Sequence, residues 1–322
     1  MMKAWGRLLR LSLAPSALAD VAAGAVFAQG GFHPAGRELW TMLAASACVY
    51  HGGMALNDWS DREHDARTRP DRPIPSGAIS ARAALVVAAL LLVLGVALAW
   101  SVGPSTGAWT SVAAAGAIAY DLVGRGPVLG PALLALCRAA NLGSGIALGL
   151  LHGTSHVGAP VEVQYAHLVP LVFYAAYVFG VSRVGRMEDA EDDAPIEPAP
   201  WILLALVALV ALPWSPPPGL ALSAAQLDFD SNGHLLPVVV LRWSAGLLAL
   251  AAAYAPLRLV ARTRTWTRPL VLRAMGLLLR RLLVLTGSLA LATCTLDGAL
   301  VAAAILAGYP LSFALRKVFP PS

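Results

Sequence analysis

Residues 82–102 read RAALVVAALLLVLGVALAWSV, an apolar run in which only the first residue, Arg82, is charged. A helix of about 20 apolar residues is long enough to cross the hydrocarbon core of a bilayer. Similar runs recur along the 322-residue chain, which is 58% hydrophobic and only 13% charged. Soluble domains are typically about 25% charged. The composition therefore excludes a soluble globular protein and predicts a helical protein that crosses a membrane several times.

Apolar windows between helix breakers locate the expected spans. They cover residues 11–29, 39–57, 82–102, 106–121, 128–150, 165–182, 199–214, 236–257 and 281–315. The last window is long enough for two helices that turn near Thr295 to Gly298. We expect an all-α, polytopic membrane bundle of nine or ten transmembrane helices, formed by residues 1–322 as a single domain.

The arginines orient these spans, because loops rich in Lys and Arg stay in the cytoplasm. With a cytoplasmic N-terminus, the loops on that side hold Arg62, Arg67, Arg69, Arg72, Arg82, Arg125, Arg183, Arg186, Arg258, Arg262, Arg264, Arg268, Arg273, Arg280 and Arg281. The two most acidic segments, 58–65 and 188–193, fall on the same side, at the ends of the second and sixth predicted spans. Topology alone does not explain acidic clusters among these arginines, so we interpret both segments as functional.

Other classes of function find no support in the sequence. The basic residues are distributed by membrane side and do not form a soluble basic face, so we expect no nucleic-acid partner. Cys48, Cys137 and Cys294 lie in separate apolar segments without metal-ligand spacing, which indicates buried free thiols rather than a disulfide or zinc site. The sequence indicates no obligate protein partner.

The first acidic segment, residues 57–65, reads NDWSDREHD. If the second helix continues through it, Asp58, Asp61 and Asp65 are spaced i, i+3, i+7 and share one face. Carboxylates stacked in this way repel one another unless a cation bridges them, and Mg²⁺ prefers such oxygen ligands together with phosphate oxygens. The pattern predicts a Mg²⁺ site for a diphosphate; the alternative is a solvated helix end with mixed charges.

The continuation, ARTRPDRPIPSG at residues 66–77, adds cations on a stiff loop. Its prolines end the helix and restrict the backbone. Arg67, Arg69 and Arg72 supply planar guanidinium donors that suit diphosphate oxygens.

The second acidic segment follows the sixth predicted span and reads RVGRMEDAEDD at residues 183–193. Asp189 and Asp193 are four residues apart, and Arg186 has the spacing to share their face. Glu188 is the alternative first ligand. The other interpretation is a charged loop before a proline-rich stretch.

Ionisable residues also fall inside the predicted spans. Asp20 lies in the first span and Arg138 in the fifth, with Asn141 one turn later. A charge at this depth costs at least ~2.5–3.5 kcal/mol, so it normally faces a partner or a cavity. Two hypotheses stay open: a purely structural pair, or Arg138 facing the diphosphate and Asp20 facing the acceptor.

The motif NDxxDxxxD at 57–65, followed by RPDRPIPSG at 69–77, resembles the first signature of the UbiA superfamily of intramembrane prenyltransferases. The resemblance implies a helical bundle around a central cavity that opens to lipid. It also implies Mg²⁺-dependent transfer of an isoprenoid chain from a prenyl diphosphate to an aromatic or other lipophilic acceptor. The segments PSALAD at 15–20 and CRAANL at 137–142 are similar to a bacterial subgroup called EboC. We therefore expect the bacterial inner membrane, with both acidic segments facing the cytoplasm.

Carried over to this chain, the resemblance assigns roles to the candidates. Metal-binding candidates are Asp58, Asp61, Asp65, Glu188, Asp189 and Asp193. Diphosphate-binding candidates are Asn57, Arg67, Arg69, Arg72, Arg138, Asn141 and Arg186. Catalytic candidates are Asp58, Asp61, Asp65, Asp20 and Arg138. Tyr120 and Arg125 resemble a family position that contacts diphosphate. The residues that usually surround the family's second acidic motif are absent from this sequence.

Two other functions fit the sequence less well. A CDP-alcohol phosphotransferase needs a DG pair followed by AR and further aspartates in one helix, which this sequence lacks. A non-catalytic or transport-type protein of the same fold stays open, because Asp20 and Arg138 suit a transporter and an altered second motif suits a scaffold.

Overall fold

The computed structural model describes residues 2–29, 36–124, 126–152, 166–187, 196–215 and 236–319. Within these ranges the regular elements are all helices. In chain order they are α1 (Met2–Leu8), η1 (Leu11–Leu13), α2 (Ala14–Gln29), α3 (Gly36–Ser60), α4 (Arg62–Thr68), α5 (Ala81–Val102), α6 (Pro104–Leu122), α7 (Leu129–His152), η2 (Ala166–Leu168), α9 (Val169–Arg186), α10 (Ala199–Ala211), η3 (Leu212–Trp214), α12 (Leu236–Arg262), α13 (Arg268–Leu291) and α14 (Leu296–Val318).

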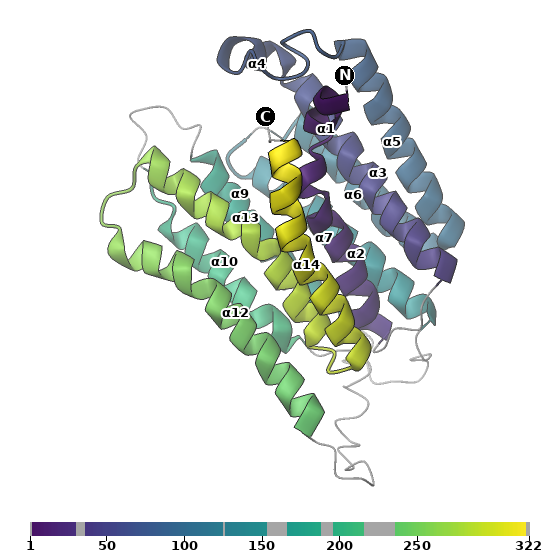
Figure 1. Ribbon diagram of the computed structural model, residues 1–322, viewed down its shortest axis with the longest axis vertical. Coiled ribbons are helices and arrows are strands. Elements are labelled where there is room, and N and C mark those ends of the chain that lie inside the picture. The colour runs from purple at the N-terminus through teal and green to yellow at the C-terminus, as the bar shows by residue number, and fades with distance from the viewer. Residues whose placement is uncertain are drawn as a thin grey trace.

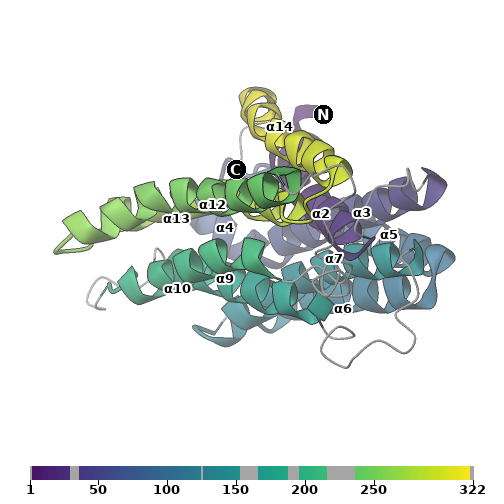
Figure 2. The ribbon, with the colours of Figure 1, turned by 90° about the horizontal axis from the view of Figure 1, so that it is seen from below.

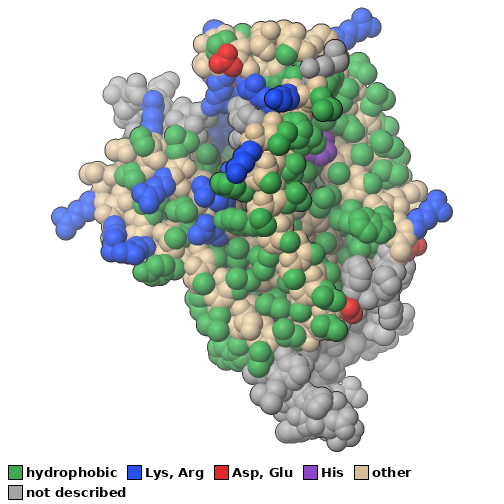
Figure 3. Space-filling model, in the orientation of Figure 1, with side chains coloured by type: hydrophobic (Ala, Val, Ile, Leu, Met, Phe, Trp, Pro, Cys, Tyr) green, Lys and Arg blue, Asp and Glu red, His purple; other side chains and the backbone are tan. Residues whose placement is uncertain are grey.

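Seven helical segments of the described chain are long and apolar enough to cross a membrane. They are Leu11–Gln29, Ala81–Val102, Leu129–Leu151, Ala166–Arg186, Val240–Arg262, Arg268–Leu291 and Leu296–Val318. Much of the surface seen in Figure 3 is hydrophobic, as a lipid-facing surface requires. The chain is an integral, multi-pass membrane protein, and the predicted all-α membrane bundle is confirmed. The count of nine or ten spans stays a prediction.

The C-terminal boundary differs from the prediction. The apolar window begins at residue 281, but α13 begins at Arg268, so its arginines are helical rather than part of a loop. The predicted turn lies between Leu291 and Leu296, where Cys294 adopts a positive φ of 60°. The Thr295 hydroxyl then accepts a hydrogen bond from the Gly298 amide at 3.0 Å and caps α14. Long arginine side chains can extend to the membrane interface from within a helix. An apolar window therefore misses the helical turns that carry them.

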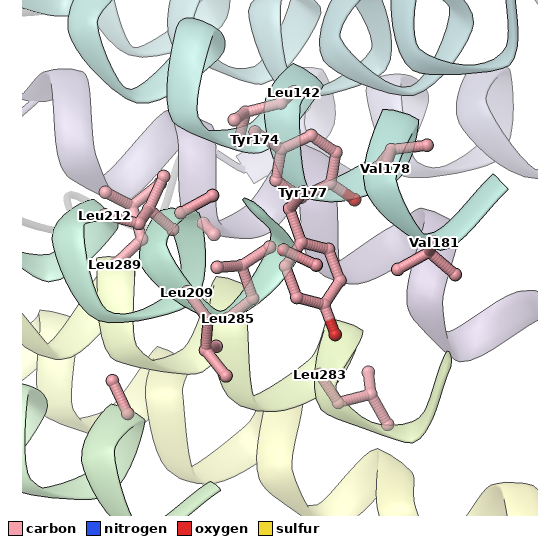
Figure 4. Packing of buried hydrophobic residues seen from close by; sticks show 14 of the residues in the cluster. Leu142, Tyr174, Tyr177, Val178, Val181, Leu209, Leu212, Leu283, Leu285 and Leu289 are labelled. Carbon is pink, nitrogen blue, oxygen red and sulfur yellow. The ribbon is translucent and has the colours of Figure 1, made fainter. Parts of the chain in front are cut away.

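The helices surround a core built on α9. Tyr174 and Tyr177 are fully buried, and the Tyr177 hydroxyl donates to the Leu278 carbonyl of α13 at 2.6 Å. Figure 4 shows both rings between Leu142 of α7 and Leu283 of α13. This packing joins α7, α9 and α13 into one wall.

Figures 1 and 2 show how the other helices enclose the interior. Helices α1 and α4 and the C-terminal end of α14 gather at one end of the bundle. In Figure 2, α14 and α6 lie on opposite sides, with α2 and α7 between them.

Small residues bring α2 and α7 into close contact. A Cβ on Gly145 would lie 2.3 Å from the Val21 carbonyl oxygen, and one on Gly149 would lie 2.3 Å from that of Ala25. Lipid supplies no hydrophobic drive between helices, so close backbone approach and polar contacts hold such pairs together. The contact sets Asp20 of α2 beside α7.

Gly145→Ala is expected to separate α2 from α7, because the backbone cannot make room for the new methyl group. Overpacking of this kind costs about 1–3 kcal/mol, so the melting temperature in detergent should fall clearly. Gly276→Ala is the control, since its Cβ would meet only the end of the flexible Arg280 side chain at 3.7 Å. Equal melting temperatures for the two variants would contradict the tight α2–α7 contact.

Candidate functional site

A cavity of about 520 Å³ lies inside the bundle. Residues of α2, α3, α6, α7, α9, α13 and α14 line it. Its walls are largely Leu, Val, Ala and Met side chains, as in sites that bind apolar ligands. The polar lining comprises Arg10, Ser16, Ser46, Tyr50, Asn57, Tyr120, Asp121, Arg138, Asn141, Ser182, Arg280, Tyr309, Ser312 and Arg316.

A smaller polar cavity of about 70 Å³ adjoins the large one. It is lined by Asn57, Asp61, Tyr120, Asp121 and Arg186. The large cavity shares Asn57, Tyr120 and Asp121 with it. The two therefore form an apolar chamber with a polar end, where α3, α6 and α9 terminate.

The helix that carries the first acidic motif does not continue unbroken. Helix α3 ends at Ser60, Asp61 is the N-cap of α4, and α4 turns across the end of the bundle (Figure 1). Asp58 and Asp65 nevertheless converge, because Arg72 returns between them from the proline-rich loop. Arg72 Nη1 lies 3.8 Å from Asp58 Oδ1 and 2.6 Å from Asp65 Oδ2. The loop, and not one continuous helical face, brings these two carboxylates together.

Arg10 belongs to this site, although the sequence marked it only as part of a basic N-terminus. It lies at the break between α1 and η1 with φ 49° and ψ 47°, a left-handed conformation that is uncommon for arginine. Its Nη2 donates to Asp58 Oδ1 at 3.2 Å and to Asn57 Oδ1 at 3.4 Å. Such outliers cluster at functional sites, but no pattern in the sequence predicts this one.

Asp121, in the last turn of α6, is a second residue that sequence reasoning missed. Its Oδ1 accepts from Asn57 Nδ2 at 3.0 Å, and its carbonyl accepts from the Ser60 hydroxyl at 2.7 Å. The sequence contained one signal for Asp121: it is an acidic residue directly after Tyr120, at the end of a predicted membrane span. Arg186 lies nearby, with its guanidinium 5.8 Å from the Tyr120 ring and its Nη2 donating to the Gly124 carbonyl at 3.3 Å.

The oxygen donors at this end fit Mg²⁺. Asp58 Oδ2 is buried and accepts no hydrogen bond within the described residues, so it has capacity for another electropositive partner. Mg²⁺ usually takes one or two carboxylates, water and phosphate oxygens, which Asp58, Asp61 and Asp121 can complement. No three His, Cys, Asp or Glu side chains in the described ranges gather as a complete site. Arg10 and Arg72 are the counter-ions of Asp58 and Asp65 instead.

A second polar network lies between α2, α7 and α9. The buried Asp20 carboxylate accepts from the Tyr174 hydroxyl at 2.5 Å and from Asn141 Nδ2 at 3.0 Å. Arg138 Nη2 lies 3.1 Å from Asp20 Oδ2 and donates to Tyr174 Oη at 3.0 Å. Arg138 and Asn141 also line the large cavity. Arg138 therefore pairs with Asp20 and also lies at the cavity wall, whereas Asp20 is fully buried and lines neither cavity. The role of Arg138 toward a diphosphate stays a prediction.

Other sequence candidates lie elsewhere. Arg67 and Arg69 are exposed and line neither cavity, so the geometry gives their predicted role no support. Arg125 and the candidates of the second motif lie outside the described residues; those candidates are Glu188, Asp189 and Asp193.

Several characterised proteins match parts of this chain. The bacteriochlorophyll synthase 33 kDa chain of Cereibacter sphaeroides is 40% identical over 100 residues, which cover 30% of this chain and 33% of that protein. A digeranylgeranylglyceryl phosphate synthase of Ignicoccus hospitalis is 46% identical over 69 residues, covering 21% and 23%. A 4-hydroxybenzoate octaprenyltransferase of Paracidovorax citrulli is 29% identical over 171 residues, covering 52% and 54%. This chain thus aligns with between about a quarter and a half of these relatives' length.

Solved structures share the fold over nearly the whole chain. A UbiA homolog from Archaeoglobus fulgidus bound to GPP and Mg²⁺ superposes with a TM-score of 0.58 at 16% identity, covering 95% of this chain and 99% of that chain. A structure described for digeranylgeranylglyceryl phosphate synthase gives a TM-score of 0.60 at 17% identity, covering 91% and 99%.

The sequence profile of the UbiA prenyltransferase family matches residues 17–320. This range contains both polar networks except Arg10, and every helix that lines the cavity except the first three residues of α2. The chain belongs to the UbiA prenyltransferase family.

Proposed function

We propose that the protein transfers an isoprenoid group from a prenyl diphosphate to a lipophilic acceptor within the membrane. The observation that carries this proposal is the polar end of an apolar chamber, where Asn57, Asp58 and Asp121 meet Arg10 and Arg186. An isoprenoid chain needs the apolar walls, and its diphosphate needs cations at one end. The named relatives and the GPP-bound homolog support the same reaction class.

Asp58 and Asp61, with Asp121 beside them, are the residues that would hold Mg²⁺. Asp65 would become a further metal ligand if the Arg72 guanidinium moved from its carboxylate to another anion. Bound there, the ion would neutralise charge on the diphosphate leaving group. The candidates Glu188, Asp189 and Asp193 remain proposals for a second ligand set.

The chain's own cations suit the departing diphosphate. In the reaction, the bond between C1 of the isoprenoid and the diphosphate oxygen breaks, and the electron pair leaves with the oxygen. C1 then bonds to the nucleophilic atom of the acceptor, which loses a proton. Arg10, Arg72 and Arg186 can stabilise the charge that develops on the diphosphate, because guanidinium–phosphate hydrogen bonds are charge-assisted. The apolar walls exclude water from the reacting carbon.

Arg138 contributes from the side of the chamber in this proposal. Asp20 and Tyr174 occupy its Nη2 and so fix the orientation of the guanidinium plane. Asn141 anchors Asp20 and extends the polar lining. The fixed guanidinium would interact with the reacting diphosphate. Both acidic segments would face the cytoplasm of a bacterial inner membrane, where soluble prenyl diphosphates are accessible.

Asp58→Asn is expected to lower Mg²⁺-dependent GPP binding and prenyl transfer by about 10²–10³-fold, as for the loss of one charge-stabilising group. Isothermal titration of purified protein with GPP, with and without Mg²⁺, measures the effect. Asp71→Asn is the matched control, because Asp71 is an exposed carboxylate in the adjoining loop. If Asp58→Asn bound GPP with unchanged Mg²⁺ dependence, the metal assignment would be wrong.

The pair Asp20 and Arg138 can be tested by removing one or both charges. Asp20→Leu alone should destabilise the protein by about 3–5 kcal/mol, because it leaves a buried, unpaired cation. The double variant, with Arg138→Leu added, should regain much of this stability yet bind GPP more weakly than wild type.

Arg138→Lys separates charge from shape, since it keeps the cation and loses the planar fork. We expect a folded protein with weakened GPP binding. A folded double variant with wild-type GPP affinity would instead assign Asp20 and Arg138 to helix packing alone.

A further inference from the structure

The turn between α12 and α13 carries a concentration of cations. The stretch RLVARTR, which ends at Arg264, closes α12 and enters the turn. Arg258, Arg262 and Arg264 are exposed, whereas Leu259 and Val260 pack against the core. Figure 3 shows basic side chains gathered at the edge of the molecule where α12 and α13 meet. We call Arg258, Arg262 and Arg264 the hairpin arginines.

Acidic side chains do not balance this cluster. Residues 236–296 contain no Asp or Glu. In the described part of the chain, no ion pair joins a hairpin arginine to an acid. The positive-inside rule explains arginines on this side of the membrane, but not the lack of acids among them. The first acidic segment differs, because its arginines alternate with the acids Asp61, Glu63, Asp65 and Asp71.

A neighbouring arginine has a structural role that the hairpin arginines lack. Pro256 lies inside α12 and has no N–H, so the Ala252 carbonyl loses its usual helical donor. Arg281 Nε of α13 donates to that carbonyl at 3.2 Å. This bond ties α13 to α12 at the level of the proline and supports the hairpin from within the bundle.

An exposed apolar stripe on α12 leads to the hairpin arginines. Leu247, Leu250 and Tyr254 are each more than half exposed and recur every three or four residues, so they share one helical face. Arg258 continues this face, and its guanidinium lies 5.9 Å from the centre of the Tyr254 ring. The order of apolar, aromatic and cationic side chains matches the order of acyl chain, interface and headgroup in one leaflet.

We infer that the hairpin arginines bind the phosphate of an anionic phospholipid whose acyl chains lie along the exposed stripe of α12. Guanidinium groups form charge-assisted hydrogen bonds with phosphate oxygens. A lipid supplies both the anion that the cations lack and the apolar surface that the stripe needs. The hairpin arginines line neither cavity, so the inference does not depend on the proposed reaction.

The test measures lipid binding to the purified full chain in dodecyl maltoside micelles by native mass spectrometry. The probes are dioleoylphosphatidylglycerol and zwitterionic dioleoylphosphatidylcholine, which share their acyl chains. Wild type should bind phosphatidylglycerol about tenfold more tightly than phosphatidylcholine. Arg258→Gln combined with Arg262→Gln and Arg264→Gln should lower the phosphatidylglycerol affinity by at least about tenfold and leave that of phosphatidylcholine unchanged. Micelles have no sidedness, so a role in topology alone would not affect the result.

Arg67→Gln combined with Arg69→Gln and Arg82→Gln is the matched control, because it removes three exposed arginines predicted to face the same side. It should leave the phosphatidylglycerol affinity nearly unchanged, since acidic residues balance the charge of that segment. Arg262→Gln alone repeats the test if the triple variant does not fold, and it should weaken phosphatidylglycerol binding by about fivefold.

Three results would overturn the inference. An unchanged phosphatidylglycerol affinity in the hairpin variant would remove the site. An equal loss in the control variant would mean that any exposed arginine attracts the lipid. Displacement of phosphatidylglycerol by inorganic phosphate at the same concentration would assign the hairpin arginines to a free anion rather than to a lipid.

Discussion

The ion pair between Asp20 and Arg138 is the interaction on which the arrangement of the chamber depends. Charges this deep in an apolar bundle persist only when they are paired and fully hydrogen-bonded. Tyr174 and Asn141 complete that requirement, so the network ties α2 to both α7 and α9. The glycine contact between α2 and α7 allows the backbones to approach closely enough for these bonds. One wall of the chamber is therefore fixed by electrostatics and close packing together.

At the polar end, arginines act as internal counter-ions for carboxylates. Asp58 and Asp65 are buried, and Arg72 lies between them while Arg10 approaches Asp58 from the N-terminal segment. This balance of charge allows Asp58 and Asp65 to lie close together. In the proposed function, a metal ion and a diphosphate would enter together with no net change in charge balance, since each arginine released from a carboxylate would gain a phosphate oxygen.

The sequence predicted the class of fold and the first acidic motif because both rest on local patterns. Apolar runs mark membrane helices, and the spacing of Asp58, Asp61 and Asp65 is visible in one stretch. The partners of Asn57, Asp58 and Asp20 include residues that could not be predicted, because they come from distant segments. Arg10, Asp121 and Tyr174 each lie in a different helix or turn, and single polar residues near span ends carry little signal alone. The predicted start of α13 was wrong because its arginines, which the hydropathy pattern placed in a loop, lie within the helix.

The bundle encloses one apolar chamber, so the two substrates of the proposed reaction would share it. Their apolar parts would have to occupy the same volume of about 520 Å³. A longer isoprenoid chain leaves less room for the acceptor, and a bulkier acceptor shortens the chain that fits. In the proposed reaction, donor length and acceptor size would thus be coupled by steric exclusion. Enlarging the wall at Leu134 or Leu283, which both line the chamber, would relax both preferences at once.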